Sequence, residues 1–248
     1  MASLKILGVI PARLASRRLP RKALRMLGEK ALVHHVYDRA VECPLFSDVL
    51  IATDSPEIES YCQERGLKVM MTAATHISGT DRVQETATRI EADVYANIQG
   101  DEPLITPPHL ELLVRPFEEN EEVRVTTLKT RIDVATAQNP NVTKVVTDHA
   151  GRALYFSRLP VPYGIASVAS PVYFKHLGLY AYRRQVLLDF PRLPASKLEA
   201  AEKLEQLRFL ENGIPVQVVE TDQDTVGVDT EEDLLKAAEL LARREGSK

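Results

Sequence analysis

The sequence predicts an α/β fold in which a mostly parallel central sheet carries helices on both faces and holds an inserted antiparallel subregion. In the first hundred residues, apolar segments of strand length alternate with amphipathic segments of helical spacing, which is typical of a parallel sheet covered by helices. Later, two β-rich segments around a short glycine-containing turn predict a hairpin. The 248 residues contain no repeat or low-complexity linker, so we expect one domain over 1–248, with 141–183 as the antiparallel subregion.

The first half of the chain contains four predicted strands and three predicted helices. The strands are apolar and rich in β-branched residues, and they cover 4–11, 48–54, 68–72 and 93–98. The helices cover 31–43, 55–66 and 80–92. In the second helix, Ser55 has the position of an N-cap and Gly66 that of a helix end.

The second half begins with the hairpin, predicted over 141–157, and continues with a long strand over 172–183. Residues 158–171 are rich in Pro, Ser and Gly and predict a mobile loop. A helix is predicted over 196–213 from apolar residues spaced by three, and a strand over 214–221. The last helix is predicted over 229–245, where Thr230 and Asp233 have the spacing of a capping box.

Composition excludes several classes of protein. A net charge of -4 disfavours general affinity for nucleic acid or for an anionic membrane. No apolar stretch is long enough to span a bilayer or to act as a signal peptide. Cys43 and Cys62 match no metal or redox spacing. We therefore expect a cytoplasmic protein with reduced cysteines, no nucleic-acid partner and no membrane partner.

A strongly basic loop follows the first predicted strand. The stretch "IPARLASRRLPRKAL" (10–24) and the next residue hold six bases, with no acid before Glu29: Arg13, Arg17, Arg18, Arg21, Lys22 and Arg25. The loop lacks the glycines and the G-K-[ST] ending of a P-loop, so its side chains rather than its backbone would bind phosphates. In an acidic protein, this loop predicts a small polyanionic ligand such as a triphosphate; the alternative is a solvated basic surface loop.

Two carboxylates are candidates for a Mg²⁺ site. Asp101 in "NIQGDEP" follows a predicted strand, at the edge of the sheet where ligands bind in this class of fold. Asp229 in "VGVDTEEDL" precedes the last helix, where capping is the simpler role. Their spacing does not establish that the two residues meet.

Two other stretches are suggestive. The loop "THISGTDR" (75–82) could read a base edge, although an N-cap at Ser78 or Thr80 explains it equally well. On the strand "FKHLGLYAYR", His176 and Tyr180 are four residues apart and share a face. A lone histidine in a strand is more often structural than functional, so the residues by themselves favour a structural role for His176.

Taken together, these stretches resemble a known family. In order, "VIPARLASRRLPRKAL", "HISGTDR", "NIQGDEPLI", "NPNVTKVV", "ALYFSRLPVPY", "HLGLYAYR", "LEQLR" and "GVDTEEDL" resemble the 3-deoxy-manno-octulosonate cytidylyltransferases, or CMP-Kdo synthetases. The resemblance runs from about residue 6 to 236, and the blocks are specific as a set, whereas the first is shared more loosely with other sugar nucleotidyltransferases.

The resemblance implies a nucleotidyltransferase fold like that of the glycosyltransferase A group, a homodimer, and the reaction CTP + Kdo → CMP-Kdo + pyrophosphate in lipopolysaccharide synthesis. It also implies roles for individual residues. The CTP-binding set is Pro11, Ala12, Arg13, Arg18, Lys22, Ser78, Gly79 and Gln99. The Mg²⁺ ligands are Asp101 and Asp229, and these two join Arg13 and Lys22 as the catalytic set. The sugar acid is held by Arg158, His176, Tyr180, Glu205 and Gln206.

One departure from the family stands in the basic loop. Family members usually read "RLPGKPL" where this chain reads "RLPRKAL", so Arg21 replaces a glycine. If that glycine needs a positive φ, Arg21 is strained there. Otherwise Arg21 adds a phosphate contact.

Other functions stay open at this point. A cytidylyltransferase could act on a sialic acid or on the 8-amino analogue of Kdo. A nucleotide-sugar glycosyltransferase would usually carry a D-x-D motif after a central strand, and none occurs there. A non-catalytic nucleotide-binding module would not need both carboxylates.

Overall fold

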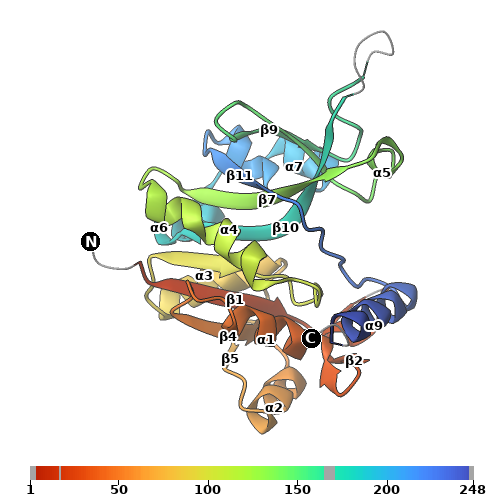
Figure 1. Cartoon of the computed structure of the whole chain (residues 1–248). Coiled ribbons are helices and arrows are strands. Elements are labelled where there is room, and N and C mark those ends of the chain that lie inside the picture. The colour runs from red at the N-terminus through yellow and green to blue at the C-terminus, as the bar shows by residue number, and fades with distance from the viewer. Residues whose placement is uncertain (1–3, 17, 165–170, 246–248) are drawn as a thin grey trace. The chain divides into compact units, whose positions relative to one another are not determined.

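The structure, a computed structural model, describes residues 4–16, 18–164 and 171–245 (Figure 1). Arg17 of the basic loop and residues 165–170 of the predicted mobile loop lie outside the described residues. The chain divides into two compact units, Met1–Glu111 with Thr225–Lys248, and Leu112–Asp224, called unit 1 and unit 2 below. The predicted antiparallel subregion, 141–183, falls inside unit 2, and a single domain over the whole chain stays a prediction.

Unit 1 contains a parallel sheet in the order β6-β1-β4-β5. The strands are β1 (Ile6–Ala12), β4 (Asp48–Thr53), β5 (Val69–Met71) and β6 (Val94–Asn97). All four match the predicted strands. Their side chains are buried along almost the whole of β1, β4 and β6, which explains why these strands read as continuous apolar runs in the sequence.

Three predicted helices of unit 1 are confirmed as α1 (Leu32–Val41), α2 (Pro56–Glu64) and α3 (Gly79–Arg89). Ser55 caps α2 through a hydrogen bond of 3.4 Å from the backbone N–H of Ile58 to its Oγ. Gly66, just beyond the end of α2, has a φ of +67°, as expected for a residue that ends a helix. Cys43 and Cys62 are buried, free thiols.

The last helix, α9 (Glu231–Glu245), belongs to unit 1 although it ends the described chain. Its predicted capping box is present, with reciprocal hydrogen bonds between Thr230 and Asp233. One face of α9 packs with the basic-loop region into a single apolar cluster: Leu19, Leu27, Leu32, Leu104, Val228, Leu234, Ala237 and Leu241. Figure 1 shows α9 beside β2 (Met26–Leu27), which pairs with β3 (Lys30–Ala31). This packing places the segment before α9 next to the basic loop.

Unit 2 is a mixed sheet in which β11 and β10 flank β7, with β8 and β9 as a hairpin beyond β10. The strands are β7 (Val125–Ile132), β8 (Lys144–Thr147), β9 (Ala153–Ser157), β10 (Tyr173–Arg183) and β11 (Val216–Thr221). The predicted hairpin and the strands over 172–183 and 214–221 are confirmed. Strand β7 and helix α4 (Pro107–Glu119) form without having been predicted.

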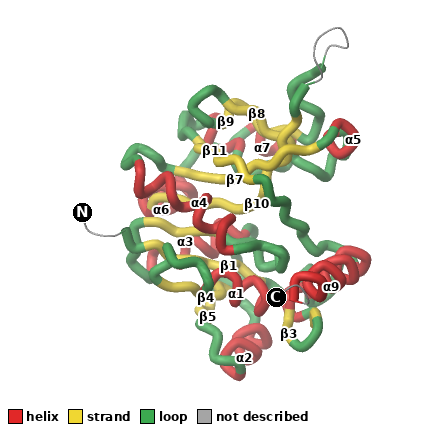
Figure 2. The backbone as a smooth tube through the Cα atoms, in the orientation of Figure 1, coloured by secondary structure: helices red, strands yellow, loops and turns green. Residues whose placement is uncertain are grey.

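The predicted helix over 196–213 is wrong. The structure has two short helices there, α7 (Lys197–Glu202) and α8 (Leu207–Glu211), separated by a turn (Figure 2). Lys203 has a φ of +57° and ends α7. Apolar residues spaced by exactly three do not stay on one face of an α-helix, which has about 3.6 residues per turn. Ala201, which was expected on the apolar face, is exposed. Unit 2 also contains α5 (Val134–Ala137) and α6 (Arg184–Asp189).

None of the described helices combines the length and the apolar composition that crossing a membrane requires.

Candidate functional site

Unit 1 contains a pocket of about 780 Å³ at the carboxyl end of β1. It is lined by the basic loop, by the start of α3, by the loop after β6 and by Asp229 before α9. Every residue predicted for CTP or for metal lines it: Pro11, Ala12, Arg13, Arg18, Lys22, Ser78, Gly79, Gln99, Asp101 and Asp229. Residues far apart in the sequence therefore meet in one pocket, at the sheet edge where ligands bind in this class of fold.

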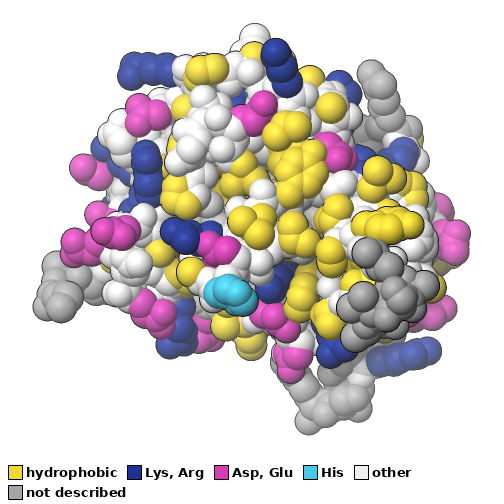
Figure 3. Space-filling model, turned by 90° about the horizontal axis from the view of Figure 1, so that it is seen from above, with side chains coloured by type: hydrophobic (Ala, Val, Ile, Leu, Met, Phe, Trp, Pro, Cys, Tyr) yellow, Lys and Arg dark blue, Asp and Glu magenta, His cyan; other side chains and the backbone are white. Residues whose placement is uncertain are grey.

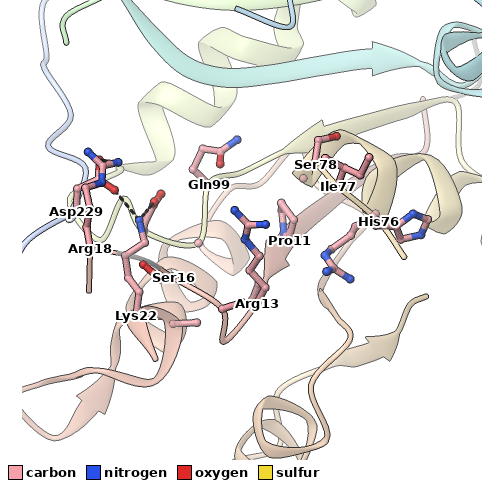
Figure 4. Close-up of a pocket in the computed structure, with 17 residues that line it drawn as sticks. Pro11, Arg13, Ser16, Arg18, Lys22, His76, Ile77, Ser78, Gln99 and Asp229 are labelled. Atoms are coloured by element: carbon pink, nitrogen blue, oxygen red, sulfur yellow. Dashed lines mark hydrogen bonds and ion pairs between the residues drawn. The ribbon is translucent and has the colours of Figure 1, made fainter. Parts of the chain in front are cut away.

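The two ends of the pocket differ in chemistry (Figure 4). Arg18, Lys22 and Asp229 lie at one end, and Ser78, Ile77 and His76 at the other. Arg13, Pro11 and Gln99 lie between them. The Arg13 side chain is exposed and makes no ion pair with any described residue. One end of the pocket thus carries two cations and a carboxylate, whereas the other presents the hydroxyl of Ser78, the apolar side chain of Ile77 and the imidazole of His76.

At the charged end, the Lys22 ammonium lies between the two candidate metal ligands. Its Nζ donates to Oδ1 of Asp229 at 2.8 Å and to Oδ2 of Asp101. Arg18 forms a second ion pair with Asp229, at 2.8 Å. Burial by itself lowers the pKa of Lys22, but the carboxylates of Asp101 and Asp229 outweigh burial and raise the pKa above its usual value. The two carboxylates therefore face a common cation.

A backbone hydrogen bond explains why Asp101 and Asp229 meet. The N–H of Val228 donates to the carbonyl oxygen of Asp101 at 2.9 Å. The backbone N–H of Asp229 donates to the side chain of Asp233 at 3.0 Å, while Thr230 supplies the cap of α9. The carboxylate of Asp229 therefore pairs with Lys22 and Arg18. Thr230, and not Asp229, caps the helix with its side chain.

Gly100 permits a close approach of two loops. A Cβ atom at this position would lie 3.0 Å from the carbonyl oxygen of Pro11. This contact is tighter than nine in ten real Cβ contacts, and the atom that it meets belongs to the backbone, so a side chain here would need the loop after β6 and the end of β1 to move apart by a few tenths of an ångström. Gly100 therefore keeps Gln99 and Asp101 close to the pocket floor.

The "HISGTDR" stretch supplies the other end of the pocket. Ser78 is the N-cap of α3 and forms a full capping box with Asp81, so it both caps the helix and lines the pocket. Three further residues of this stretch line the pocket and were not named by the sequence interpretation: His76, Ile77 and Arg82. Arg82 is buried and bonds to Asp54 at 2.8 Å and to Thr72 at 2.7 Å. His76 bonds through Nε2 to Glu85.

Arg21 does not line the pocket. Its φ of +59° and ψ of +30° place it in the left-handed region, just before the short 3₁₀ helix η1 (Lys22–Leu24). Its guanidinium pairs with Glu57 of α2. Of the two interpretations of this departure from the family pattern, the strained backbone is the one that the structure contains.

A second group of predicted residues lies in unit 2. The rings of His176 and Tyr180 are 5.3 Å apart between centroids. On a regular strand, residues four apart are separated by about 13 Å. The register between β10 and β7 shifts between Leu177 and Tyr180, so β10 is not a regular strand there. We attribute the contact between the two rings to this bulge.

The protonation state of His176 follows from its surroundings. Oγ1 of Thr127 lies 3.0 Å from Nε2 of His176 and donates to the carbonyl oxygen of Leu179 at 2.7 Å. The hydroxyl has one proton, so it accepts the proton of Nε2 and leaves Nδ1 as an acceptor. Burial, with a smaller effect from Lys175, lowers the pKa of His176 to about 3. His176 is therefore neutral.

The other three residues of this group also lie in unit 2. Arg158 follows β9, and its guanidinium donates to the carbonyl oxygens of Glu202 at 2.7 Å and Pro140 at 3.2 Å. Glu205 is close enough to Tyr180 to add to the effect of burial, which raises the pKa of that tyrosine. Gln206 is buried, and its Nε2 has no hydrogen-bond partner among the described residues.

Comparison with known proteins gives consistent matches over nearly the whole chain. The sequence profile of a family described as "Cytidylyltransferase" matches residues 7–222. A 3-deoxy-manno-octulosonate cytidylyltransferase from Koribacter versatilis is 50% identical over 242 residues, which cover 98% of this chain and 92% of the relative. One from Acidobacterium capsulatum is 49% identical, with 98% and 99% covered. A solved structure of CMP:2-keto-3-deoxy-manno-octonic acid synthetase complexed with CTP is 43% identical and superposes with a TM-score of 0.94, covering 97% of this chain and 99% of that one.

Proposed function

Because this chain belongs to the family of 3-deoxy-manno-octulosonate cytidylyltransferases, we propose that it transfers CMP from CTP to the anomeric hydroxyl of Kdo and releases pyrophosphate. The observation that carries the proposal is the pocket of unit 1, where all ten residues expected for CTP and metal line one cavity of about 780 Å³. A pocket of this size is in the range that small-molecule ligands occupy.

In this proposal, the two ends of the pocket hold the two ends of CTP. Arg13, Arg18 and Lys22 neutralise the triphosphate, because several cations together suit a group with about four negative charges. Ser78, Gly79 and Gln99 read the cytosine, and Pro11 and Ala12 form the floor at the end of β1. The side-chain amide of Gln99 makes no hydrogen bond with the described residues, so it is available to a base edge.

Asp101 and Asp229 would hold Mg²⁺. They fit the ion because both carboxylates already face one cation, the ammonium of Lys22. Among the described residues, no group of three or more His, Cys, Asp or Glu side chains could hold a metal, so the phosphates and water would complete the coordination, as Mg²⁺ prefers. When bound, the ion would polarise the α-phosphate and favour ionisation of the attacking hydroxyl.

The chemistry asked of the chain is mainly positioning and charge neutralisation. Kdo carries no phosphate, so its anomeric hydroxyl attacks the α-phosphorus directly and pyrophosphate leaves. Lys22 and Arg13 stabilise the charge on the leaving pyrophosphate, and Arg18 assists. No covalent enzyme intermediate is needed.

The sugar acid would bind to the group in unit 2. Arg158 supplies a guanidinium for the carboxylate, and neutral His176 offers Nδ1 to a sugar hydroxyl. Tyr180, Glu205 and the unpartnered amide of Gln206 provide further polar atoms. A buried amide group without a partner is costly, and a bound hydroxyl or carboxylate would satisfy it.

The proposal includes a homodimer and a cytoplasmic location, where CTP is made. Hydrophobic side chains gather on the face of the molecule shown in Figure 3. Unit 2 leaves Leu154, Leu159 and Tyr163 exposed by 62%, 69% and 88%. All three belong to the 141–183 subregion, which we expect to bind the sugar acid and to form the dimer contact. Light scattering on the wild type and on a Leu154→Glu/Leu159→Glu double variant tests the dimer.

The experiment for the function is pyrophosphate release from purified protein with CTP and Mg²⁺. Separate reactions contain Kdo, its 8-amino analogue, a sialic acid or no sugar. Release with Kdo alone is the expected result. Release with another acid would keep the reaction and change the acceptor, whereas CTP binding without release in any reaction would favour the non-catalytic nucleotide-binding module.

A further inference from the structure

Unit 2 contains a lysine with no exposed surface. Lys144 begins β8, and its ammonium donates to the carbonyl oxygens of Asn139 at 3.0 Å, of Val142 at 2.6 Å and of Arg158. An ammonium has three N–H groups, and each has an acceptor here. Burying such a charge costs several kcal/mol unless its donors are satisfied, so this cage of carbonyls is what allows Lys144 to be buried.

The third carbonyl connects Lys144 to the proposed sugar-acid residues. The peptide groups around Arg158 are fixed on both sides: Lys144 binds the carbonyl oxygen, and Glu202 accepts the backbone N–H at 3.0 Å. Glu202 also accepts the hydroxyl of Ser157 at 3.0 Å. The main chain of Arg158 thus lies between a buried cation and a carboxylate.

The same network reaches the turn after α7. The guanidinium of Arg158 bonds to the carbonyl oxygen of Glu202 and to that of Pro140. Pro140 belongs to the loop that Lys144 holds through Asn139 and Val142. The turn that follows Glu202 carries Glu205 and Gln206. Three segments, the 139–142 loop, the end of β9 and the 202–206 turn, are therefore tied together at Lys144 and Arg158.

We propose that Lys144 is a positioning residue for the acidic-sugar site, fixing the main chain of Arg158 and, through Arg158, the turn that presents Glu205 and Gln206. This inference rests on the proposed function, because it takes these three residues as sugar contacts. Lys144 has no exposed surface, so it would act on the site through Arg158 and not by contact with substrate. Its loss misplaces several contacts at once, and displacements of about 1 Å can cost on the order of 100-fold in activity.

The test uses Lys144→Met, which keeps an unbranched side chain one atom shorter and removes the three donors. We expect the KM for the acidic sugar to rise by at least about tenfold, while the dissociation constant for CTP, whose proposed site lies in unit 1, changes by less than about twofold. Lys144→Gln, which keeps an N–H₂ group, restores part of the affinity for the sugar.

Arg183→Met is the matched control. Arg183 is also a cation that donates to main-chain carbonyls in unit 2, those of Phe117 at 2.9 Å and Val123 at 3.2 Å, but it lies at the far end of β10 from His176. Both variants lower the melting temperature. Only Lys144→Met raises the KM for the sugar, because a loss of stability alone does not separate the two substrates.

A second readout does not depend on turnover. Lys144→Met speeds amide hydrogen exchange in the 153–158 and 200–207 segments, and Arg183→Met does not. If Lys144→Met leaves exchange in these segments unchanged, or speeds it without altering the KM for the sugar, the inference is overturned. The proposed function still stands in that case, provided that the wild type turns over with the sugar. Absence of sugar-dependent turnover in the wild type overturns the proposed function, and the role of Lys144 in sugar binding falls with it.

Discussion

Nζ of Lys22 lies 2.8 Å from Oδ1 of Asp229, and the same ammonium binds Asp101. The residue expected to contact the phosphates of CTP thus occupies the space between the two expected metal ligands. In the proposed function, Lys22 and a divalent cation would compete for the same carboxylates, and an incoming triphosphate would draw the lysine away from them. We expect metal binding and CTP binding to be coupled through this side chain.

Lys22→Met tests this coupling. Without CTP, the variant binds Mn²⁺ more tightly than the wild type, because no ammonium competes for Asp101 and Asp229. It binds CTP more weakly, by about 1.5–3 kcal/mol if one charge-assisted contact is lost. Electron paramagnetic resonance of free Mn²⁺ and calorimetry with CTP measure the two effects. Lys30→Met, which removes an exposed lysine paired with Asp38, is the control. Weaker Mn²⁺ binding by Lys22→Met would contradict the competition.

Asp101→Asn and Asp229→Asn each remove one proposed metal ligand without changing the size of the side chain. We expect kcat to fall by more than about 100-fold in each variant, since even residues behind a metal ligand typically contribute 10–100-fold. Circular dichroism should show an intact fold. Asp38→Asn serves as a surface control. Near-normal kcat in either site variant would show that the metal assignment is wrong.

Arg21 allows a test of backbone strain. Its φ of +59° lies in the left-handed region, which costs most residues other than glycine about 1–2 kcal/mol of stability. Asn tolerates this backbone conformation more readily than Arg. The exposed pair with Glu57 that would be lost contributes little. Arg21→Asn should therefore raise the melting temperature slightly and leave the dissociation constant for CTP within about twofold. A tenfold loss of CTP affinity would mean that Arg21 contacts the phosphates after all.

His176 predicts a particular dependence on pH. Its pKa in the folded protein is about 3, below the unfolded value of about 6.5. Its contribution to stability is therefore complete above pH 6.5 and is lost as the pH falls toward 3, because only the unfolded state gains the proton. Its ring signals in NMR should not titrate between pH 5 and 8. His176→Gln should weaken the loss of stability over the acidic range, and a ring titration near pH 6.5 would contradict the burial described here.

Much of unit 1 could be predicted from the sequence because its strands and helices have clear periods. Strand β7 was missed, although six of its eight residues are buried, because "VTTLKTRI" reads as a polar stretch with one leucine. The buried threonines satisfy their hydroxyls locally, as Thr126 does by donating to the carbonyl oxygen of Leu113. Propensity and hydropathy do not reveal such bonds.

The residues of the pocket could be named in advance, largely through the family resemblance, but their meeting could not. Asp101 and Asp229 come together through the hydrogen bond from Val228 and through the apolar face of α9, both of which are tertiary contacts. The cage around Lys144 is likewise invisible in the sequence, because two of its three partners are carbonyls of a loop and the third belongs to another strand end.

The return of the last helix to unit 1 has a consequence for synthesis on the ribosome. Lys22 and Asp229 are separated by 207 positions, so the charged end of the pocket lacks one carboxylate until another 207 residues have been translated after Lys22. An unfinished or prematurely terminated chain would retain most of the basic loop's cations without Asp229 to pair with Lys22 and Arg18.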